Sequence, residues 1–220
     1  RRQRQMCIRD RTYAGNHTEE ITYTCVCGDS CTTVAEIPCP SGAFTDLPAS
    51  WYHEGVDEAI YRGLFKGMSN TKFGPQISMT RGQFVTVLYR MYGAPDVNVA
   101  APFADVDSKA YYADAVAWAY EEGYVKGISD KAFGPDAPMT REMVVTILWR
   151  MEDEPVSKQA LTAYADANRI STYARQAMAW AVEQNLIQGV SETSLAPQGV
   201  ATRAQGALLL VRYARAFCDS

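Results

Sequence analysis

Cysteine and histidine are scarce in this 220-residue chain and are unevenly placed. Residues 40–217 contain no cysteine, so the main body has no disulfide and no thiolate metal site. The two histidines, His17 and His53, lie outside any His-Glu-x-x-His pattern, and neither a Gly-x-Ser-x-Gly nor a phosphate-binding Gly-x-x-x-x-Gly-Lys-Ser/Thr sequence occurs. These absences exclude the enzyme classes that depend on those motifs.

Long apolar runs are also missing. No stretch approaches the roughly 20 apolar residues of a membrane helix, and the N-terminus lacks the apolar region of a secretory signal. If the protein is exported, its signal is expected outside this sequence. A cysteine-free main body is typical of an exported bacterial protein.

Positive charge is concentrated at one end. The net charge is −4, yet residues 1–11 carry five arginines against one aspartate, and residues 44–220 are mildly acidic. Nucleic-acid binders usually present a basic face, so this balance argues against that class. It leaves open an anionic ligand held by a few placed arginines.

A sequence of about 60 residues is present three times. Residues 63–81 and 123–141 match at ten of nineteen positions without a gap, and residues 185–203 are a more diverged third copy. Apolar residues at helical spacing predict a first helix in each copy, followed by a loop rich in Gly, Pro and Ser and a second helix that begins after a threonine. Two short helices bury too little surface alone, so the copies must pack on one another.

The domain organisation follows from these copies. The chain is predicted to be all-α, with a small irregular or β segment at 1–43 and repeats at 44–100, 101–160 and 161–220. Packing physics alone permits either closure about a pseudo-threefold axis or a short solenoid.

A threonine and an arginine open each predicted second helix. Threonine suits the N-cap, and Gln83 and Gln205 would complete capping boxes in the first and third copies. The arginine then sits at the positive end of the helix dipole, which disfavours a cation. Either three anion sites exist there, or each arginine pairs with a carboxylate, for example of the neighbouring copy, or covers apolar surface with its stem.

The first copy has the order Phe44-x-Asp46, an aromatic residue, an apolar helix, Gly63-x-x-Lys66-Gly67, Phe73-x-Pro75 and Thr80-Arg81. The next two copies follow this order, with substitutions in the third, and the early aromatics are Trp51, Tyr111 and Tyr173. This order resembles the S-layer homology (SLH) repeat. The resemblance covers residues 44–213 and implies a pseudo-threefold helical module. Such a module anchors a bacterial surface protein to an acidic, often pyruvylated, secondary cell-wall polysaccharide, which binds in grooves between repeats.

Several residues take a role from the resemblance. The arginines would be the main ligand contacts, the lysines would add charge, and the glycines would allow close approach. For the early aromatics a structural role is favoured over sugar stacking, and Asp46, Asp105 and Asp166 are expected to cap the first helices. The candidate ligand-binding residues are Arg81, Arg141, Arg203, Thr80, Thr140, Thr202, Lys66, Lys126, Gly67, Gly127, Trp51 and Tyr111.

Departures from the family pattern concentrate in the third copy. The acid that usually follows Thr-Arg-Ala is Gln83, Met143 or Gln205 here, and Gln188 replaces the loop lysine in copy three. A weaker or vacant third groove is therefore expected, with Arg203→Ala costing less affinity than the other two substitutions.

The first 43 residues lie outside the repeats. Alternation predicts short strands at 20–26 and 32–37, and the basic residues 1–11 resemble an artefact of sequencing rather than natural sequence. Cys25, Cys27, Cys31 and Cys39 have poor spacing for zinc, and His17 is a weak extra ligand. Disulfides or the end of an upstream domain are favoured, and no metal or cofactor is expected.

Two other classes of function were weighed. A glycosidase needs only two carboxylates, but a single active site gives no reason for three copies, so an enzyme is not expected. The alternative is a helical-repeat module that binds a protein through an apolar face. The expected location is the cell wall or S-layer of a Gram-positive bacterium, with an upstream cargo domain in the full-length protein and no membrane insertion or nucleic-acid partner.

Overall fold

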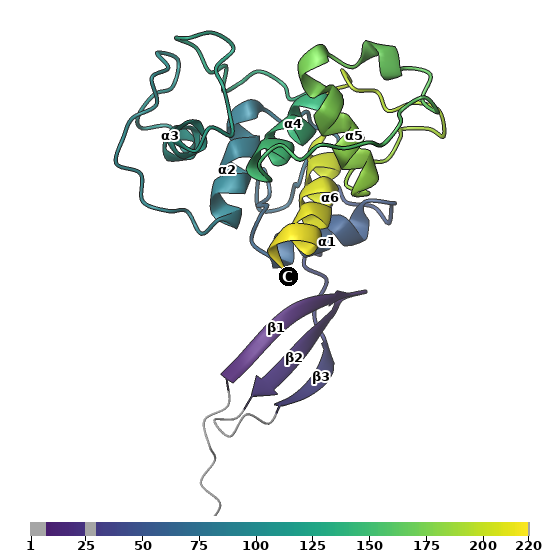
Figure 1. Ribbon diagram of the computed structural model, residues 1–220. Helices are drawn as coiled ribbons and strands as arrows, with labels where there is room; N and C mark the ends of the chain where they lie inside the picture. Colours follow the sequence, from purple (N-terminus) through teal and green to yellow (C-terminus); the bar gives the residue numbers. More distant parts are fainter. Residues whose placement is uncertain (1–7, 25–29, 220) are drawn as a thin grey trace, which may run out of the picture. The chain divides into compact units, whose positions relative to one another are not determined.

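A computed structural model describes residues 8–24 and 30–219. The chain divides into two compact units, Arg1–Gly74 and Pro75–Ser220. The division falls inside the first repeat, so the first helix of that repeat belongs to one unit and its second helix to the other (Figure 1). Among the described residues, no helix is long and apolar enough to cross a membrane.

The N-terminal unit contains a three-stranded antiparallel sheet. Its strands are β1 (Ile8–Gly15), β2 (Thr18–Thr24) and β3 (Ser30–Glu36), in that spatial order. Asn16 and His17 form the turn between β1 and β2, and both have left-handed φ values, of 48° and 57°. Two such residues are what a tight hairpin turn requires.

The two predicted strands are confirmed with small shifts, but β1 was not predicted. Ile8–Arg11, part of the segment interpreted as an artefact, pairs in register with residues 21–24 of β2. Two arginines and one aspartate in this segment hid its strand character, because its only strongly apolar residue is Ile8. Residues 1–7 and the Cys25 and Cys27 positions lie outside the described residues.

Each repeat contributes two α-helices, as predicted. Thr80, Thr140 and Thr202 are the N-caps of the second helices, and Gln83 and Gln205 complete the two capping boxes. The helices are α1 (His53–Tyr61), α2 (Arg81–Met91), α3 (Ala113–Glu121), α4 (Arg141–Met151), α5 (Arg175–Glu183) and α6 (Arg203–Tyr213). Short 3₁₀ turns at Ala167–Arg169 and Thr172–Ala174 precede α5, and a π-helical turn at Ala214–Cys218 follows α6.

A left-handed residue ends each first helix. Gly63 and Gly123 have φ values of 72° and 77°, and Asn185 takes the same conformation in the third copy with φ of 55°. Asparagine tolerates this conformation better than other non-glycine residues, which explains how the third copy lost its glycine.

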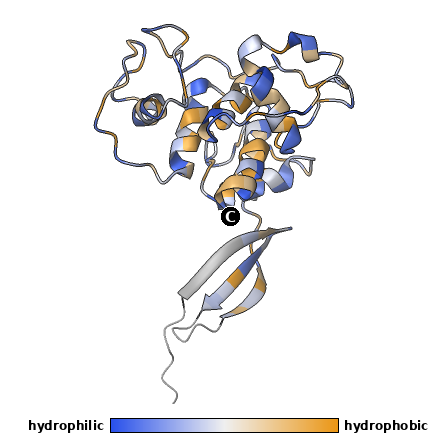
Figure 2. Cartoon of the chain, viewed as in Figure 1, coloured by the Kyte–Doolittle hydropathy of each residue, from blue (hydrophilic) through white to orange (hydrophobic). Residues whose placement is uncertain are grey.

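The core of the Pro75–Ser220 unit forms where the second helix of one repeat packs on the first helix of the next. Helix α2 contacts α3, and α4 contacts α5. Phe84, Leu88, Val144, Leu148 and Leu210 are almost completely buried. The hydropathy colouring shows apolar residues gathered on these helices (Figure 2).

Backbone hydrogen bonds join the three segments that lead into the second helices. The N–H of Met139 donates to the carbonyl of Met79, that of Ala201 to Met139, and that of Met79 to Ala201, at 2.8 to 2.9 Å. The three bonds form a closed ring in which each copy donates to another. A backbone ring of this kind links the copies whatever side chains they carry.

The early aspartates hold loops and do not cap helices, which corrects the expectation. Asp105 accepts hydrogen bonds from the backbone N–H groups of Phe133 and Gly134 at 2.8 and 2.7 Å, and Asp46 and Asp166 bind the same place in their own copies. Burial raises the pKa of each carboxyl, but the donated N–H groups outweigh it, so the three pKa values lie below the ordinary value.

Replacing Asp105 with asparagine is expected to lower the free energy of unfolding by about 1 kcal/mol at neutral pH, because the amide cannot accept both N–H groups. Asp105 is exposed, and solvent limits the effect. Its folded pKa is depressed, so the stabilisation is present above the ordinary aspartate pKa of about 3.9 and is lost as pH falls through the folded value. The free energies of unfolding of the two proteins, measured with urea, should therefore become equal in acid. A difference that does not depend on pH would contradict the proposed role of the Asp105 carboxylate.

Candidate functional site

The three arginines that open the second helices are almost completely buried. Arg81 and Arg141 are each 9% exposed, and Arg203 is 6% exposed. A buried guanidinium must satisfy most of its five N–H donors. The partners therefore decide what these residues do.

Arg81 and Arg141 bind backbone carbonyls of the following repeat. The Nε of Arg81 donates to Phe133 O at 2.9 Å and its Nη2 to Lys126 O at 2.8 Å, and the guanidinium lies 4.5 Å from the centre of the Phe133 ring. Arg141 repeats the pattern with Leu195 O and Gln188 O, at 2.8 and 2.6 Å. These described partners are carbonyls, which does not agree with the alternative that these two arginines pair with carboxylates.

This pattern changes the role assigned to the arginine. Burial lowers the pKa of Arg81, but a guanidinium does not lose its proton in a protein, so the group stays charged at any physiological pH. The positive charge of Arg81 therefore lies at a repeat boundary, where Nε and Nη2 of its guanidinium bind the loop of the second copy. Arg81 organises the loop and also brings positive charge to the space beside it.

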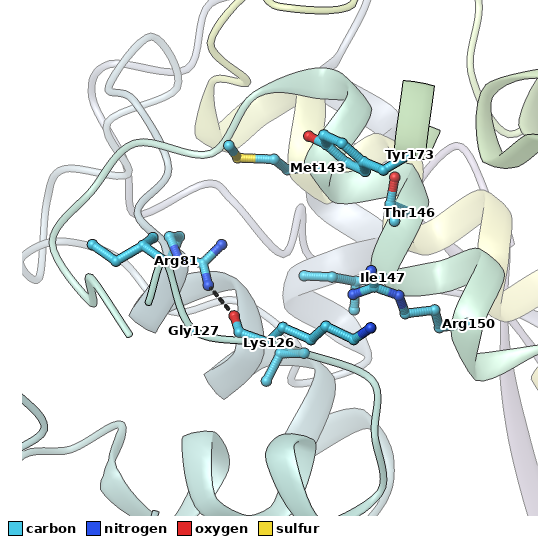
Figure 3. A pocket seen from close by; sticks show the side chains of 10 residues that line it. Arg81, Lys126, Gly127, Met143, Thr146, Ile147, Arg150 and Tyr173 are labelled. Atoms are coloured by element: carbon cyan, nitrogen blue, oxygen red, sulfur yellow. Dashed lines mark hydrogen bonds between the residues drawn. The ribbon is translucent and has the colours of Figure 1, made fainter. Parts of the chain in front are cut away.

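That space is a cavity of about 230 Å³ in the Pro75–Ser220 unit (Figure 3). All three copies contribute: Arg81 from the first, the 125–128 loop and α4 from the second, and Tyr173 from the third. The residues that give it its chemistry are Arg81, Lys126, Gly127, Arg150 and Tyr173. Met143, Thr146 and Ile147 of α4 complete its wall.

The cavity is cationic. Three positively charged side chains line it, and none of the described residues that line it is acidic. Lys126 is exposed, and Arg150 is partly exposed while its Nη1 donates to Tyr124 O at 3.2 Å. Glu154 Oε1 lies 3.9 Å from Arg150 Nε, so an anion entering here would compete with this exposed carboxylate for Arg150. It would also meet the N–H donors of Arg81 and Lys126.

An aromatic ring stands at the edge of the same cavity. Tyr173 is 49% exposed, and its hydroxyl donates to Glu142 Oε1 at 3.3 Å. Burial and the negative charge of Glu142 raise the pKa of Tyr173 to about 12. Glu142 is itself buried and accepts from the N–H and hydroxyl of Ser171, at 3.0 and 2.6 Å. The ring is therefore held in place with much of its surface free.

The other early aromatics are still more open. Trp51 is 67% exposed and Tyr111 is 64% exposed, which argues against the favoured role of sealing the repeat boundary. Burial raises the pKa of Tyr111, and the positive charge of Arg203 acts in the opposite direction. An aromatic and a cation thus influence each other here as well.

The loop lysines and glycines take separate roles. Lys66 and Lys126 are exposed. Gly127 has no room for a side chain, because an added Cβ would meet the carbonyls of Ser129 and Ala132. Gly67 is confined in the same way by Phe44 and Ser69. The loop's own packing therefore requires glycine at both positions.

The three N-cap threonines bind the backbone of their own helices. The hydroxyl oxygens of Thr80, Thr140 and Thr202 each accept the N–H three residues later, at 3.3 Å. Residues Trp51, Lys66 and Gly67 belong to the Arg1–Gly74 unit, so the described cavity unites only Arg81, Lys126 and Gly127 of the twelve candidates.

The diverged loop of the third copy meets Arg141, not Arg203. Gln188, which replaces the loop lysine, accepts Arg141 through its carbonyl and Arg212 Nη2 through its side-chain oxygen at 3.3 Å. The expected weakening was assigned to Arg203 and the third copy. Because Arg81 and Arg141 reach into the following copy, the described groove without a lysine is the one that contains Arg141.

Arg150 and Glu142 were not predicted as site residues. The sequence carries a signal for the first of them, because an arginine follows the Thr-Arg arginine after nine residues in every copy, as Arg90, Arg150 and Arg212. Glu142 has no counterpart in the other copies, where Gly82 and Ala204 occupy its position.

Comparison with known proteins agrees with this architecture. The family model of the S-layer homology domain matches residues 43–85, 102–142 and 163–207. These segments make up more than half of the chain, which belongs to the S-layer homology domain family, as the resemblance predicted.

Curated relatives share this region at lower identity. An amylopullulanase of Thermoanaerobacterium thermosulfurigenes is 28% identical over 76% of this chain and 9% of its own length. The exoglucanase XynX of Acetivibrio thermocellus is 27% identical over 77% of this chain and 16% of its own length. The surface-layer 125 kDa protein of Lysinibacillus sphaericus is 29% identical over 72% of this chain and 14% of its own length. The chain spans less than a fifth of the length of each of these relatives.

Proposed function

We propose that this chain is a non-covalent cell-wall anchoring module that binds an acidic secondary cell-wall polysaccharide, such as a pyruvylated one. The observation that carries the proposal is the cavity beside Arg81, where three cations and the ring of Tyr173 line a space without acidic residues. Carboxylates of such a polymer would accept the free N–H donors, while a sugar face would lie on the aromatic ring.

The cavity is one of several equivalent grooves in this proposal. The closed ring of bonds through Met79, Met139 and Ala201 supports a pseudo-threefold arrangement of the repeats, in which each arginine faces the next copy. The matching partners of Arg81 and Arg141 support the same relation.

The role proposed for the module is attachment, without catalysis. Relatives named as a pullulanase and a glucanase match over only 9% and 16% of their length, which supports an accessory part shared among different enzymes. The relative named as a surface-layer protein supports a location at the outer surface of a Gram-positive bacterium. A cargo domain in the full-length protein would then set the biological role.

Sedimentation with purified Gram-positive cell walls tests the proposal. The chain should pellet with intact walls, remain in solution with walls stripped of secondary polysaccharide by acid, and detach as salt rises, because exposed charges are screened. Equal binding to both wall preparations that also resists salt would overturn the proposal and favour an apolar interface with a protein.

A lysine at position 188 is expected to strengthen wall binding. Gln188→Lys restores the cation that the second copy has at Lys126 and releases Arg212 from the glutamine oxygen. One added exposed charge is worth up to about 1 kcal/mol, so affinity should rise about twofold to fivefold. Gln198→Lys adds the same charge at another exposed loop position and serves as the control. An equal rise in both variants would mean that only net charge matters.

A further inference from the structure

Both histidines of the chain lie together in the Arg1–Gly74 unit, beside Cys39 and Asp57. The Nε2 atoms of His17 and His53 are 3.0 and 3.3 Å from the same carboxylate oxygen, Oδ2 of Asp57. The Sγ of Cys39 is 3.7 Å from His53 Nε2 and 3.7 Å from that oxygen. All four candidate ligand atoms lie within 4.8 Å of one another.

These residues come from three separate places in the chain. His17 lies in the turn between β1 and β2, Cys39 follows β3, and His53 and Asp57 are one turn apart on α1. Residues four apart share a helix face, so both side chains point the same way. One thiolate, two imidazoles and one carboxylate thus lie close together, although their spacing in the sequence is not that of a known metal-binding motif.

Four of the six separations among these atoms are close to those in a four-coordinate metal site. With metal–ligand bonds of about 2.0 to 2.3 Å, tetrahedral ligand atoms lie about 3.3 to 3.8 Å apart. Three of the four separations above fall in that range, and the fourth differs by a few tenths of an ångström. We infer that His17, Cys39, His53 and Asp57 form a binding site for a divalent metal of the zinc class.

The carboxylate of Asp57 is buried and oriented, as a metal ligand requires. The Asp57 side chain is 0% exposed, and its second oxygen, Oδ1, accepts the backbone N–H of Ser41 at 3.0 Å. A buried carboxylate requires positive charge nearby, and a hydrogen bond to its outer oxygen is the usual way to orient a metal ligand. Imidazole, thiolate and carboxylate together are a ligand set that zinc accepts.

The same residues do not form a nucleophile and base. In such a pair, one ring nitrogen faces the thiol and the other faces an orienting acid. Here Nε2 of His53 faces both Cys39 and Asp57, while its Nδ1 is buried and has no hydrogen-bond partner within residues 8–24 and 30–219. Four protein ligands leave no open position, so the metal fastens the hairpin turn to α1 in a structural role.

The other copies lack these ligands. Alanine and arginine occupy the positions equivalent to His53 in copies two and three, as Ala113 and Arg175. Alanine occupies both positions equivalent to Asp57, as Ala117 and Ala179. The ligands on α1 thus occur only in the copy that follows the N-terminal sheet, whose β1–β2 turn carries the ligand His17.

Cobalt(II) titration tests the site without any activity assay. The full chain is used in a background that keeps Cys39 as the single thiol, with serine at positions 7, 25, 27, 31 and 218. One equivalent of cobalt should bind with a thiolate-to-metal charge-transfer band and visible bands of four-coordinate cobalt, and zinc should displace it. Zinc should also raise the urea midpoint of unfolding.

Substitutions on that background separate ligands from neighbours. Cys39→Ser should abolish the charge-transfer band, and His17→Ala, at a turn that tolerates change, should weaken binding at least about tenfold. Glu54→Gln removes a carboxylate of the same helix that is not a ligand, and it should bind cobalt as the background does. No binding in the background, or a spectrum that Cys39→Ser leaves unchanged, would overturn the proposal.

Discussion

Replacing Arg81 with alanine is expected to lower the free energy of unfolding by about 3 kcal/mol. The substitution leaves the carbonyls of Phe133 and Lys126 without their donor, removes the guanidinium from the Phe133 ring and opens space at a buried position. Urea unfolding followed by circular dichroism measures the change. The effect comes from the repeat boundary, so wall binding should fall together with stability.

Two further substitutions at this helix make the result specific. Arg81→Lys keeps the charge but cannot form the two-point contact, so it should recover only part of the loss. Arg90→Ala removes an exposed arginine from the last turn of α2 and should change stability by less than about 0.5 kcal/mol. If Arg81→Ala were as mild as Arg90→Ala, the contacts to the next copy would contribute little.

Reversing the charge of Lys126 is expected to weaken wall binding at least about tenfold and to leave stability unchanged. Its side chain is exposed at the cavity, between Arg81 and Arg150, while only its backbone carbonyl holds Arg81. Lys126→Glu would therefore place a carboxylate against the acidic ligand and neutralise the local field. Sedimentation with walls over a range of protein concentration gives the affinity.

Lys131 provides the matched control for that experiment. It lies five positions further along the same loop, is exposed and does not line the cavity. Lys131→Glu makes the same change in net charge, so it should bind walls nearly as the wild type does. Equal losses in the two variants would show that binding follows net charge and that the cavity has no special part.

Helix positions could be predicted because their signals are local. Apolar spacing predicted the four helices of the first two copies, and the repeat extended the prediction to the third copy. The threonine with glutamine three residues later marked where α2 and α6 begin. The conformation that ends a first helix persisted even where asparagine replaced glycine at Asn185. Each of these features depends on residues within a few positions of one another.

The partners of the arginines could not be predicted from the same signals. Arg81 binds carbonyls 45 and 52 residues away. Every residue type has a backbone carbonyl, so the sequence does not indicate which carbonyls accept these hydrogen bonds. The expectation about Arg203 and the third copy stays a prediction, but the pattern of the repeat did not say that the loop of the third copy meets Arg141. The aspartates were misassigned because their partners are also backbone groups, in a loop 27 to 30 residues away.

The ligands of the proposed metal site were hidden by distance in sequence. His17, Cys39 and His53 are spread over 36 residues and belong to a turn, a loop and a helix. The sequence led us to consider Cys39 and His17 together with Cys25, Cys27 and Cys31, and not together with His53 and Asp57. Comparison of the three copies could have revealed the two ligands on α1, because histidine and aspartate lie there where the other copies have mostly alanine.

Backbone amide shifts of the isotope-labelled chain, recorded while fragments of the secondary cell-wall polysaccharide are added, test the central claim most directly. The claim is that an anionic sugar chain binds in the cavity lined by Arg81, Lys126, Gly127, Arg150 and Tyr173. The largest shifts are expected at Gly127, Ile128 and Tyr173, and Lys126→Glu should abolish them. Shifts that cluster elsewhere on the Pro75–Ser220 unit, or no shifts at saturating fragment, would contradict the account.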